Sequence, residues 1–414
     1  MRRLGLCLLF LLIAGGCAEP KGQATVVWVS IDGFRHDYLE RFTPPTLTRL
    51  AHDGAFTTQE MPIFPSLTFP NHAAQVTGRN VDGHGIPSNA FLDTKDNQAY
   101  RLPDSGFVLR TEPIWFTAKR QGLRVAAISW PMSHLQLGPL KSDYFLDSYD
   151  SQLTDRQRLQ FTARILRDDH VNKPPLRLVL TYMSHVDSIG HRNGPDSPEI
   201  REAVLQADQE ISEFLDHIET WFDATHRKND ELYLLLTTDH GMATVKTRVN
   251  MDLLVGAQLL EGSTPSLGGP MAMLYLTAVP LAERAERAEK IVEKLKEQPF
   301  IQAWLAKDVP ESLHFSDPSR IGEVVALLPP GYVWTEQRLA AIQPVAAGNT
   351  PGAHGYDPAA TPDMLGAAIV WRYRHPMNGV DLGPVSNTQW HASVAHWLGI
   401  SAAPESDGRV IPLP

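Results

Sequence analysis

Runs of β-branched and other apolar residues recur along the chain and are separated by polar segments. Such runs predict strands that are buried on both faces of a sheet. The predicted strands cover residues 24–31, 123–129, 176–182, 231–238 and 366–371. Apolar residues at helical spacing predict helices over residues 44–54, 151–170, 198–226 and 390–399. Because strands alternate with helices, the pattern predicts an α/β fold, a mostly parallel sheet with helices on both faces.

The alternation of strands and helices changes after about residue 245. Residues 271–277 and 320–328 predict further strands, and residues 281–298 predict a charged helix. This part of the chain therefore predicts a smaller α+β insertion within the larger fold. The predicted division is a core of residues 24–245 and 346–414 and an insertion of residues 246–345.

Side chains that can bind a metal follow the predicted strands or lie in loops beside them. They are Asp32, Asp187, His191, Asp239, His240 and His354. Ligands of doubly wound sheets bind at this carboxyl edge, and one helical turn would bring Asp187 and His191 to the same face. A lone Asp–His pair is typical of a surface or capping feature. Three aspartates and three histidines at one edge instead predict a site for a borderline metal such as zinc.

Thr68 precedes Pro70 and a segment that can continue as a helix. Proline suits the first helical turn, where its missing N–H costs nothing. Thr68 would then lie at or just before a helix N-terminus, among backbone N–H groups that favour an anion. A helix cap is the simpler interpretation of such a threonine. Because the chain also contains the six candidate metal-binding residues, the Thr68 hydroxyl becomes a candidate nucleophile for a phosphoryl group.

Five segments carry these residues, in the order IDGFR (31–35), SLTFPNH (66–72), VDSIGH (186–191), TDHGM (238–242) and AHGY (353–356). As a set they resemble the nucleotide pyrophosphatase/phosphodiesterase family, the type I phosphodiesterases of the alkaline phosphatase superfamily. The resemblance covers residues 25–405 and implies an alkaline phosphatase-like core.

The resemblance also implies a chemistry: two zinc ions per chain and hydrolysis of phosphodiester or phosphoanhydride bonds through a phosphothreonyl intermediate. Thr68 would be the nucleophile. The implied ligand sets are Asp187, His191 and His354 for one ion, and Asp32, Thr68, Asp239 and His240 for the other.

Three further residues are implied to bind the substrate, a small phosphodiester or nucleotide. Asn89 matches the family's asparagine that binds a non-bridging phosphoryl oxygen. Trp130 and Tyr182 resemble residues near the leaving-group pocket, and core packing is the alternative for each. Many relatives carry acidic residues or proline where this chain has residues 184–186, so the leaving group stays open. His72 and His84 are interpreted as structural.

Composition limits the partners of the protein. The chain is 43% hydrophobic and 20% charged, as in a soluble globular protein, and its net charge is −10. The net charge argues against a nucleic-acid scaffold, so local positive charge would have to hold an anionic substrate. Four arginines of the helix at 151–170 predict a solvated face: Arg156, Arg158, Arg164 and Arg167.

Three other functions fit the sequence less well. A phosphomonoesterase of the same superfamily needs an extra cation, but the sequence shows no arginine near Thr68, and Arg79 is interpreted as a surface residue. A cysteine-type sulfatase is excluded because no cysteine follows Cys17, and the serine type is disfavoured. A non-catalytic, surface-anchored metal-binding protein would have to keep all six ligands and the nucleophile without using them.

The N-terminus has the pattern that is typical of an export signal. Two arginines precede an apolar run at residues 4–16 that is too short to span a bilayer. Residues 14–17 resemble a bacterial lipobox, in which Cys17 would become the lipidated first residue; ordinary cleavage near Gly16 or Ala18 is the alternative. With alanine after Cys17, we expect a protein anchored to the outer membrane on the periplasmic side, which touches the membrane only through that lipid.

Lipidation of Cys17 can be tested by fractionation in a Gram-negative host. Wild-type protein should sediment with membranes and incorporate labelled palmitate, because acyl chains on one residue give stable anchoring. The Cys17→Ala variant should be soluble periplasmic protein or uncleaved precursor without label. A soluble, unlabelled wild type with its N-terminus at Ala18 would show that the signal is an ordinary one.

Overall fold

The computed structural model describes residues 22–101, 108–134, 136, 138–169, 173–337, 340–346, 348 and 350–414. Cys17 and the export signal predicted around it lie outside these residues.

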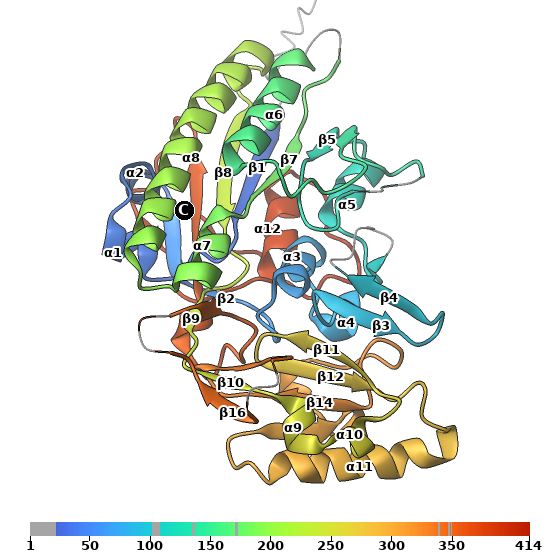
Figure 1. The fold of residues 1–414 in the computed structure, drawn as a ribbon. Coiled ribbons are helices and arrows are strands. Elements are labelled where there is room, and N and C mark those ends of the chain that lie inside the picture. Colours follow the sequence, from blue (N-terminus) through green and yellow to red (C-terminus); the bar gives the residue numbers. More distant parts are fainter. Residues whose placement is uncertain are drawn as a thin grey trace, which may run out of the picture.

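A nine-stranded sheet forms the centre of the molecule (Figure 1). Its strands are β1 (Ala24–Ile31), β2 (Ala55–Met61), β5 (Val125–Ala127), β6 (Tyr144–Phe145), β7 (Leu178–Met183), β8 (Glu231–Thr237), β18 (Gly366–Arg372), β19 (Val380–Asp381) and β20 (Val385–Ser386). Their order is β19-β2-β18-β8-β1-β7-β5-β6, with β20 beside β2. Strand β1 pairs in parallel with β7 and β8, whereas β18 is antiparallel to β8 and β2. The predicted α/β fold with a mostly parallel sheet is thus confirmed.

Strand β1 is buried on both faces because its alternate side chains enter different cores. Val27 and Val29 belong to one hydrophobic core, and Val26 and Trp28 belong to the other. Successive side chains of a strand point to opposite faces, so an unbroken apolar run is what a doubly covered strand requires.

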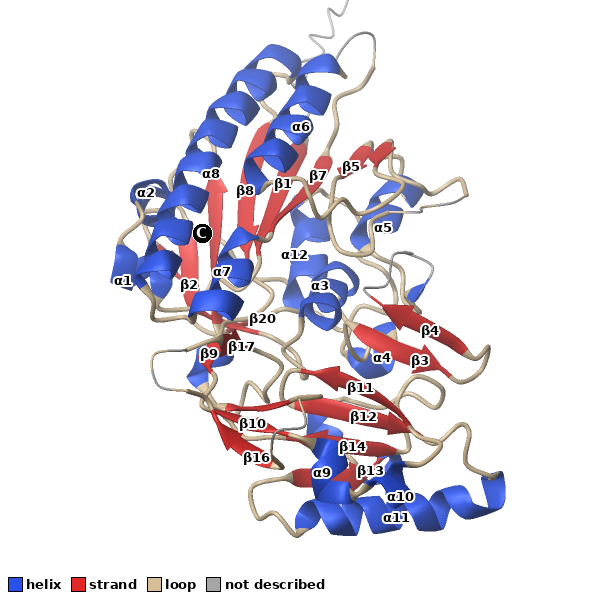
Figure 2. Cartoon of the chain, in the orientation of Figure 1, coloured by secondary structure: helices blue, strands red, loops and turns tan. Residues whose placement is uncertain are grey.

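Helices cover both faces of the sheet, as Figure 2 shows in blue. The first core receives side chains from α1 (Tyr38–Phe42), α2 (Pro45–Asp53), α6 (Asp155–Asp168), α7 (His185–Asn193) and α8 (Pro198–Thr225). The second core receives them from α3 (Thr68–Thr77), α5 (Ile114–Arg120) and α12 (Gln389–Trp397). The predicted helices at 44–54, 151–170, 198–226 and 390–399 correspond to α2, α6, α8 and α12. The predicted strand at 123–129 is shorter, since only residues 125–127 join the ladder with β7.

One predicted surface feature is wrong. Of the four arginines of α6, Arg156, Arg164 and Arg167 reach solvent, but the side chain of Arg158 is only 2% exposed. Polar partners inside the fold accept hydrogen bonds from both Nη atoms of Arg158, beginning with Asp155 one turn earlier at 2.9 Å. Charge periodicity alone could not reveal a buried partner of this kind.

Residues 251–334 build a second, antiparallel sheet below the first (Figure 1). Its strands are β11 (Thr264–Gly268), β12 (Met271–Tyr275), β13 (Gln302–Leu305) and β14 (Val324–Leu327), in the order β11-β12-β14-β13. Its helices are α9 (Met251–Val255), α10 (Ala257–Leu260) and α11 (Leu281–Lys296). These elements match the strands and the charged helix expected there. The exact domain boundaries stay a prediction.

Smaller elements join the two sheets. A three-stranded sheet contains β10 (Thr247–Val249), β15 (Tyr332–Trp334) and β16 (Ile342–Pro344), and a two-stranded one contains β9 (Ala243–Thr244) and β17 (Gly352–Ala353). The hairpin of β3 (Ala90–Asp93) and β4 (Gln98–Arg101) follows α4 (Val81–His84). Single turns of 3-10 helix lie at Ala306–Asp308, Glu311–Leu313 and Pro362–Met364.

The second sheet supports the β3–β4 hairpin through Arg320. Its guanidinium is buried and donates to Asp93 Oδ2 at 2.8 Å, to the Gly85 carbonyl at 2.7 Å and to the Val108 carbonyl at 2.6 Å. This side chain, from the turn before β14, therefore holds residues on both sides of Asn89.

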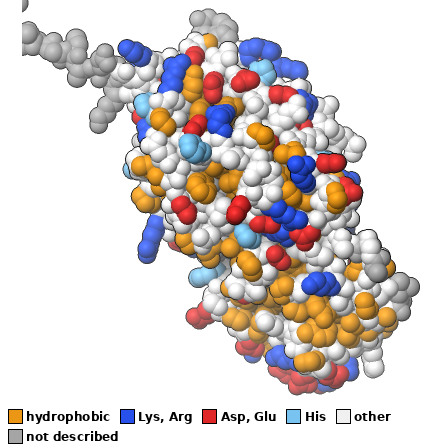
Figure 3. Space-filling model, turned by 90° about the vertical axis from the view of Figure 1, so that its left-hand side faces the viewer, with side chains coloured by type: hydrophobic (Ala, Val, Ile, Leu, Met, Phe, Trp, Pro, Cys, Tyr) orange, Lys and Arg blue, Asp and Glu red, His pale blue; other side chains and the backbone are white. Residues whose placement is uncertain are grey.

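The surface drawn in Figure 3 carries side chains of several kinds. On the face drawn in Figure 3, charged and apolar side chains are interspersed, and apolar ones gather over the lower part, where Figure 1 places the second sheet. Within the part of the chain that the structure describes, no helix is both long and apolar enough to cross a bilayer.

Replacing Arg320 should destabilise the protein. The Arg320→Met variant leaves the buried Asp93 carboxylate unpaired, which should lower the free energy of unfolding by about 3 kcal/mol, measured by urea denaturation. The exposed Lys290, which pairs with Glu286 on α11, provides the control, and Lys290→Met should unfold like the wild type. Equal stability of both variants would contradict the role of Arg320.

Candidate active site

The carboxyl edge of the central sheet gathers all six predicted metal ligands. Asp32 directly follows β1, Asp239 and His240 follow β8, and α7 begins two residues after β7. Asp187 and His191 lie on that helix, and His354 directly follows β17. Since β7, β1 and β8 are neighbours in the sheet, their carboxyl ends bring these side chains together.

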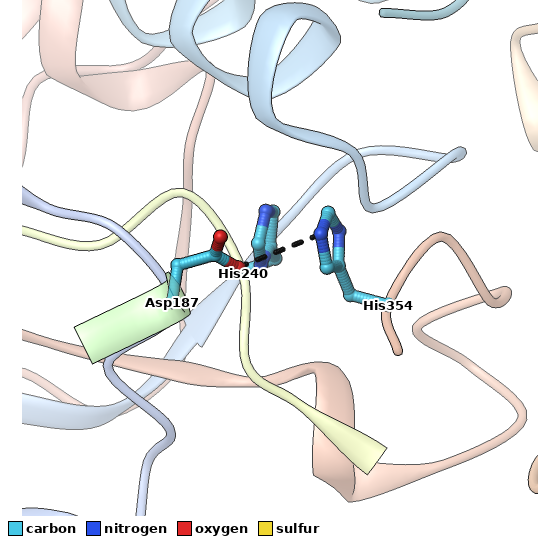
Figure 4. Close-up of side chains that lie close together, drawn as sticks. All are labelled: Asp187, His240 and His354. Atoms are coloured by element: carbon cyan, nitrogen blue, oxygen red, sulfur yellow. Dashed lines mark ion pairs between the residues drawn. The ribbon is translucent and has the colours of Figure 1, made fainter. Parts of the chain in front are cut away.

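Asp187, His191 and His354 form one group. Asp187 Oδ1 lies 3.4 Å from His191 Nε2 and 3.6 Å from His354 Nε2. The two Nε2 atoms are 3.0 Å apart. Three potential ligand atoms thus converge on one small volume, as the sequence predicts. Figure 4 shows Asp187 and His354 directed towards each other from their different segments.

Asp32, Asp239 and His240 form the second group. His240 Nε2 lies 3.0 Å from Asp239 Oδ2 and 3.5 Å from Asp32 Oδ1. Its ring also stacks on His354 with a centroid separation of 3.5 Å, and ligand atoms of Asp187, His240 and His354 lie within 4.8 Å of one another. His240 therefore lies between the two groups, which share one continuous site.

The histidines present the same nitrogen to this site. Nδ1 of His191, His240 and His354 lies 2.9–3.0 Å from the carbonyl oxygens of Gly352, Gly241 and Ser66, respectively. A carbonyl can only accept, so Nδ1 carries the hydrogen and the Nε2 lone pair faces the carboxylates. Metal-binding histidines are oriented by such contacts.

The carboxylates fit a cation equally well. Asp32 Oδ1, Asp187 Oδ1 and Asp239 Oδ2 are buried and accept no hydrogen bond from any residue that the structure describes. Buried charged oxygens without partners are costly. Three such oxygens beside three Nε2 atoms are a donor set that suits zinc or a similar ion.

Burial and mutual repulsion perturb the acids. Burial, and then the carboxylates of Asp239 and Asp187, raise the pKa of Asp32 well above its usual value. Burial likewise raises the pKa of Asp187. Burial also opposes ionisation of Asp239, but His240 and His72 outweigh it and hold the pKa of Asp239 below its usual value. A cation in the site would favour the ionised form of all three.

Thr68 lies beside the second group. It is the first residue of α3, as predicted, and its Oγ1 is 3.3 Å from His240 Nε2. The next backbone N–H, that of Phe69, donates to Asn89 Oδ1 at 3.0 Å. The structure therefore places the candidate nucleophile and the predicted phosphoryl-binding asparagine side by side.

The other predicted residues take different positions. Tyr182 lines the cleft, and its hydroxyl donates to Asp32 Oδ2. Trp130 is fully buried, with its ring 5.0 Å from that of Trp28, which matches the core-packing alternative. His72 is buried between Ser30 Oγ at 2.9 Å and the Thr68 carbonyl at 2.8 Å, so it supports the nucleophile's turn.

A cleft of about 560 Å³ opens above these groups. Pro131, which follows Trp130 in the segment implied to lie near the leaving group, lines this cleft. Its walls also include side chains to which the sequence analysis gave no role: Phe69, Arg101, His134, Tyr149 and Ser188. Arg101 corrects the expectation that no arginine lies near Thr68. It pairs with Ala90 across the β3–β4 hairpin, beside Asn89. The alternating residues around the turn at 94–97 were the signal that could have predicted this pairing.

A family model described as type I phosphodiesterase/nucleotide pyrophosphatase matches residues 26–357. The chain belongs to this family. An uncharacterised pyrophosphatase/phosphodiesterase of Schizosaccharomyces pombe is 30% identical over 93% of this chain and 79% of its own length. The bis(5'-adenosyl)-triphosphatase ENPP4 of Bos taurus is 27% identical over 98% of this chain and 85% of its own length.

Solved structures of the pyrophosphatase/phosphodiesterase family share the fold. Human family member 5 superposes with a TM-score of 0.79 and 24% identity, over 93% of this chain and 97% of that one. An inactive form of the murine member 5 in complex with AMP gives a TM-score of 0.76 at 22% identity, over 94% of this chain and 98% of that one. The predicted family and its fold are thus confirmed, and with them the assignment to phosphodiesterase and pyrophosphatase hydrolases.

Proposed function

We propose that the protein is a two-zinc phosphodiesterase/nucleotide pyrophosphatase that works through a phosphothreonyl intermediate. One observation carries the proposal: the Thr68 hydroxyl lies 3.3 Å from His240, the residue that the two groups of potential ligand atoms share. The orphaned oxygens of Asp32, Asp187 and Asp239 support the presence of cations there.

Two groups of side chains would hold the ions. Asp187, His191 and His354 form one, and Asp32, Asp239 and His240 form the other, with Thr68 Oγ1 beside His240. When bound, two such ions stabilise negative charge on the attacking and leaving oxygens of an in-line displacement.

The reaction takes place in two steps. Thr68 Oγ1 gives its proton to water and bonds to phosphorus, while the bond from phosphorus to the leaving-group oxygen breaks and that oxygen takes a proton back from water. Water then cleaves the bond between phosphorus and Thr68, which releases the phosphoryl product and restores the hydroxyl. Asn89, beside the Thr68 turn, is placed to bind a non-bridging phosphoryl oxygen.

A nucleotide is the substrate class that fits the cleft best. Its volume of about 560 Å³ lies within the usual range for small-molecule sites. The aromatic side chains of Phe69, Tyr149 and Tyr182 line it, which suits a base or another planar group. One relative is named for hydrolysis of a dinucleoside triphosphate, and a family member of the same fold binds AMP. A panel of ATP, a dinucleoside polyphosphate, glycerophosphocholine and p-nitrophenyl esters would identify the leaving group.

Arg101 makes a phosphomonoesterase the second candidate. It lines the cleft, and no ion pair joins it to an acidic side chain among the described residues. A free guanidinium can bind the extra charge of a dianionic phosphate. Its neighbourhood with Asn89 across the hairpin supports a role near the phosphoryl group.

The proposed location is the periplasmic side of the cell envelope, with a lipid anchor at Cys17. The basic start, the apolar run and the lipobox-like residues 14–17 support it. The polar residues 18–23 would then form a short tether between the anchor and β1. The proposed partners are therefore a small substrate and, through the anchor alone, the membrane.

The Thr68→Ala variant should lose nearly all turnover. Without the hydroxyl no covalent intermediate forms, so kcat should fall about a thousandfold or more, while the metal content stays near that of the wild type. The Thr68→Ser variant keeps the chemistry and should retain part of the activity. Wild-type turnover of bis-p-nitrophenyl phosphate by Thr68→Ala would disprove the assigned role.

Metal analysis provides the second test. Purified protein should contain two zinc ions per chain, and chelation should abolish activity that zinc restores. The Asp187→Ala and Asp239→Ala variants should each lose most of one equivalent, because each removes a ligand of a different group. Full activity after exhaustive chelation would contradict a metal-dependent reaction.

Substrate preference separates the two candidate functions. A diesterase should show at least tenfold higher kcat/KM for bis-p-nitrophenyl phosphate than for p-nitrophenyl phosphate. The Arg101→Ala variant should lower any activity on the monoester more than on the diester, since the monoester carries the additional charge. Lys95→Ala, at the turn of the same hairpin, is the control. A tenfold preference for the monoester would favour the phosphatase.

A further inference from the structure

Arg158 is a buried cation that makes four hydrogen bonds behind the wall of the cleft. Its Nη1 atom lies 2.9 Å from both Asp155 Oδ1 and Ser184 Oγ. Its Nη2 atom donates to the Tyr149 hydroxyl at 2.9 Å and to the Asp150 carbonyl at 3.3 Å. The guanidinium thus joins α6 to the loop that carries Tyr149 and to the residue that precedes α7. The fifth contact is its cation–π approach to the Tyr149 ring, at 5.1 Å.

Asp155 completes the connection to α7. Its Oδ1 accepts the Ser184 N–H and its Oδ2 accepts the His185 N–H, both at 2.9 Å. No side chain within α7 caps that terminus, so a carboxylate from α6 satisfies N–H groups that would otherwise be unpaired. Asp187 and His191 lie one and two turns further along the same helix.

Arg158 also contacts two residues that line the cleft. Tyr149 and Ser184 line the cleft, and the Tyr182 ring, whose hydroxyl donates to Asp32, lies 6.5 Å from the Tyr149 ring. Arg158 lies over both rings, 5.1 Å from Tyr149 and 5.9 Å from Tyr182. One ion pair therefore contacts an aromatic wall of the cleft and the base of the helix with the metal ligands.

We propose that Asp155 and Arg158 form a positioning pair that couples the cleft wall at Tyr149 to the α7 ligands Asp187 and His191. Neither residue touches the reacting atoms. The inference rests on the proposed function, because it assigns to Asp187 and His191 a bound metal and to Tyr149 a bound substrate.

Burial explains why the pair can transmit position. The side chains of Arg158 and Asp155 are 2% and 3% exposed, so water cannot replace a lost contact and each contact fixes the geometry of the next. If α7 moves, Asp155 must move, and the Arg158 contact with the Tyr149 hydroxyl changes with it. Among the described residues, the solvent-exposed arginines of α6 (Arg156, Arg164 and Arg167) donate no hydrogen bond to Tyr149 or to Ser184.

A double-mutant cycle tests the substrate side. Asp155→Asn combined with Arg158→Met replaces the ion pair without leaving one charge buried alone. We expect the combined variant to raise KM for bis-p-nitrophenyl phosphate five- to tenfold with kcat changed less than threefold. Tyr149→Phe should raise KM about threefold in the wild type and cause no further increase in the combined variant. A purely structural role predicts instead that the two effects multiply, which would overturn the proposal.

Release of metal tests the other side without any substrate. Zinc should transfer from the combined variant to a chelator about tenfold faster than from the wild type, whereas Tyr149→Phe should leave the transfer rate unchanged. Arg164→Met, on the exposed face of α6, is the matched control and should behave like the wild type in both measurements. If the combined variant does not fold, Arg158→Lys, which keeps the charge but cannot reach all partners, should show both effects at about a third of the size.

The outcomes distinguish this inference from the function on which it rests. A wild type that binds no metal and hydrolyses no diester contradicts the proposed function and this inference together. A metal-loaded, active wild type whose KM and zinc release do not depend on the pair contradicts the inference alone.

Discussion

Mutual repulsion of three close carboxylates is the constraint on which the site depends. Asp32, Asp187 and Asp239 are brought together by the carboxyl ends of adjacent parallel strands. Asp32 and Asp239 are buried and the Asp187 side chain is only 16% exposed, so little water screens their charges. Close like charges resist simultaneous ionisation, so this edge of the sheet favours cationic partners beside the carboxylate oxygens. The two hydrophobic cores stabilise the fold, so the protein can tolerate the unfavourable repulsion between the carboxylates at this edge of the sheet.

The side of the cleft near Asn89 and Arg101 is supported by a different part of the fold from the side that carries the candidate metal ligands. The candidate metal ligands stand at the edge of the central sheet, whereas Asn89 directly precedes, and Arg101 ends, a hairpin that Arg320 holds from the turn before β14. The second sheet also shares a hydrophobic core with Leu67 and Phe69 beside Thr68, through Met271, Met273 and Leu327. None of the described residues of the insertion lines the cleft itself, so the insertion supports the Thr68 turn and the hairpin from behind.

Periodicity and spacing in the sequence predicted the sheet and its main helices, and they brought six candidate metal-binding residues to one edge of it. Asp32 is an example: an unbroken apolar run stops at an aspartate, and a parallel sheet places that aspartate at its carboxyl edge. The role of Arg158 could not be predicted from charge periodicity, because its burial depends on contacts with distant residues such as Ser184. The position of Arg101 depends on hairpin pairing with Ala90, a local pattern that the sequence analysis did not use. The position of His240 between the two groups follows from three segments meeting in space.

Three histidines of the site owe their orientation to main-chain carbonyls, those of Ser66, Gly241 and Gly352. Every amino acid supplies the same carbonyl, but two of the three positions have no room for a side chain. A Cβ at Gly241 would lie 2.1 Å from the Asp363 carbonyl oxygen, and one at Gly352 would lie 2.5 Å from the Gly190 carbonyl oxygen. The orientation of the histidines therefore depends on the close approach of backbone to backbone, and the two glycines matter to the site although they have no side chain to contribute.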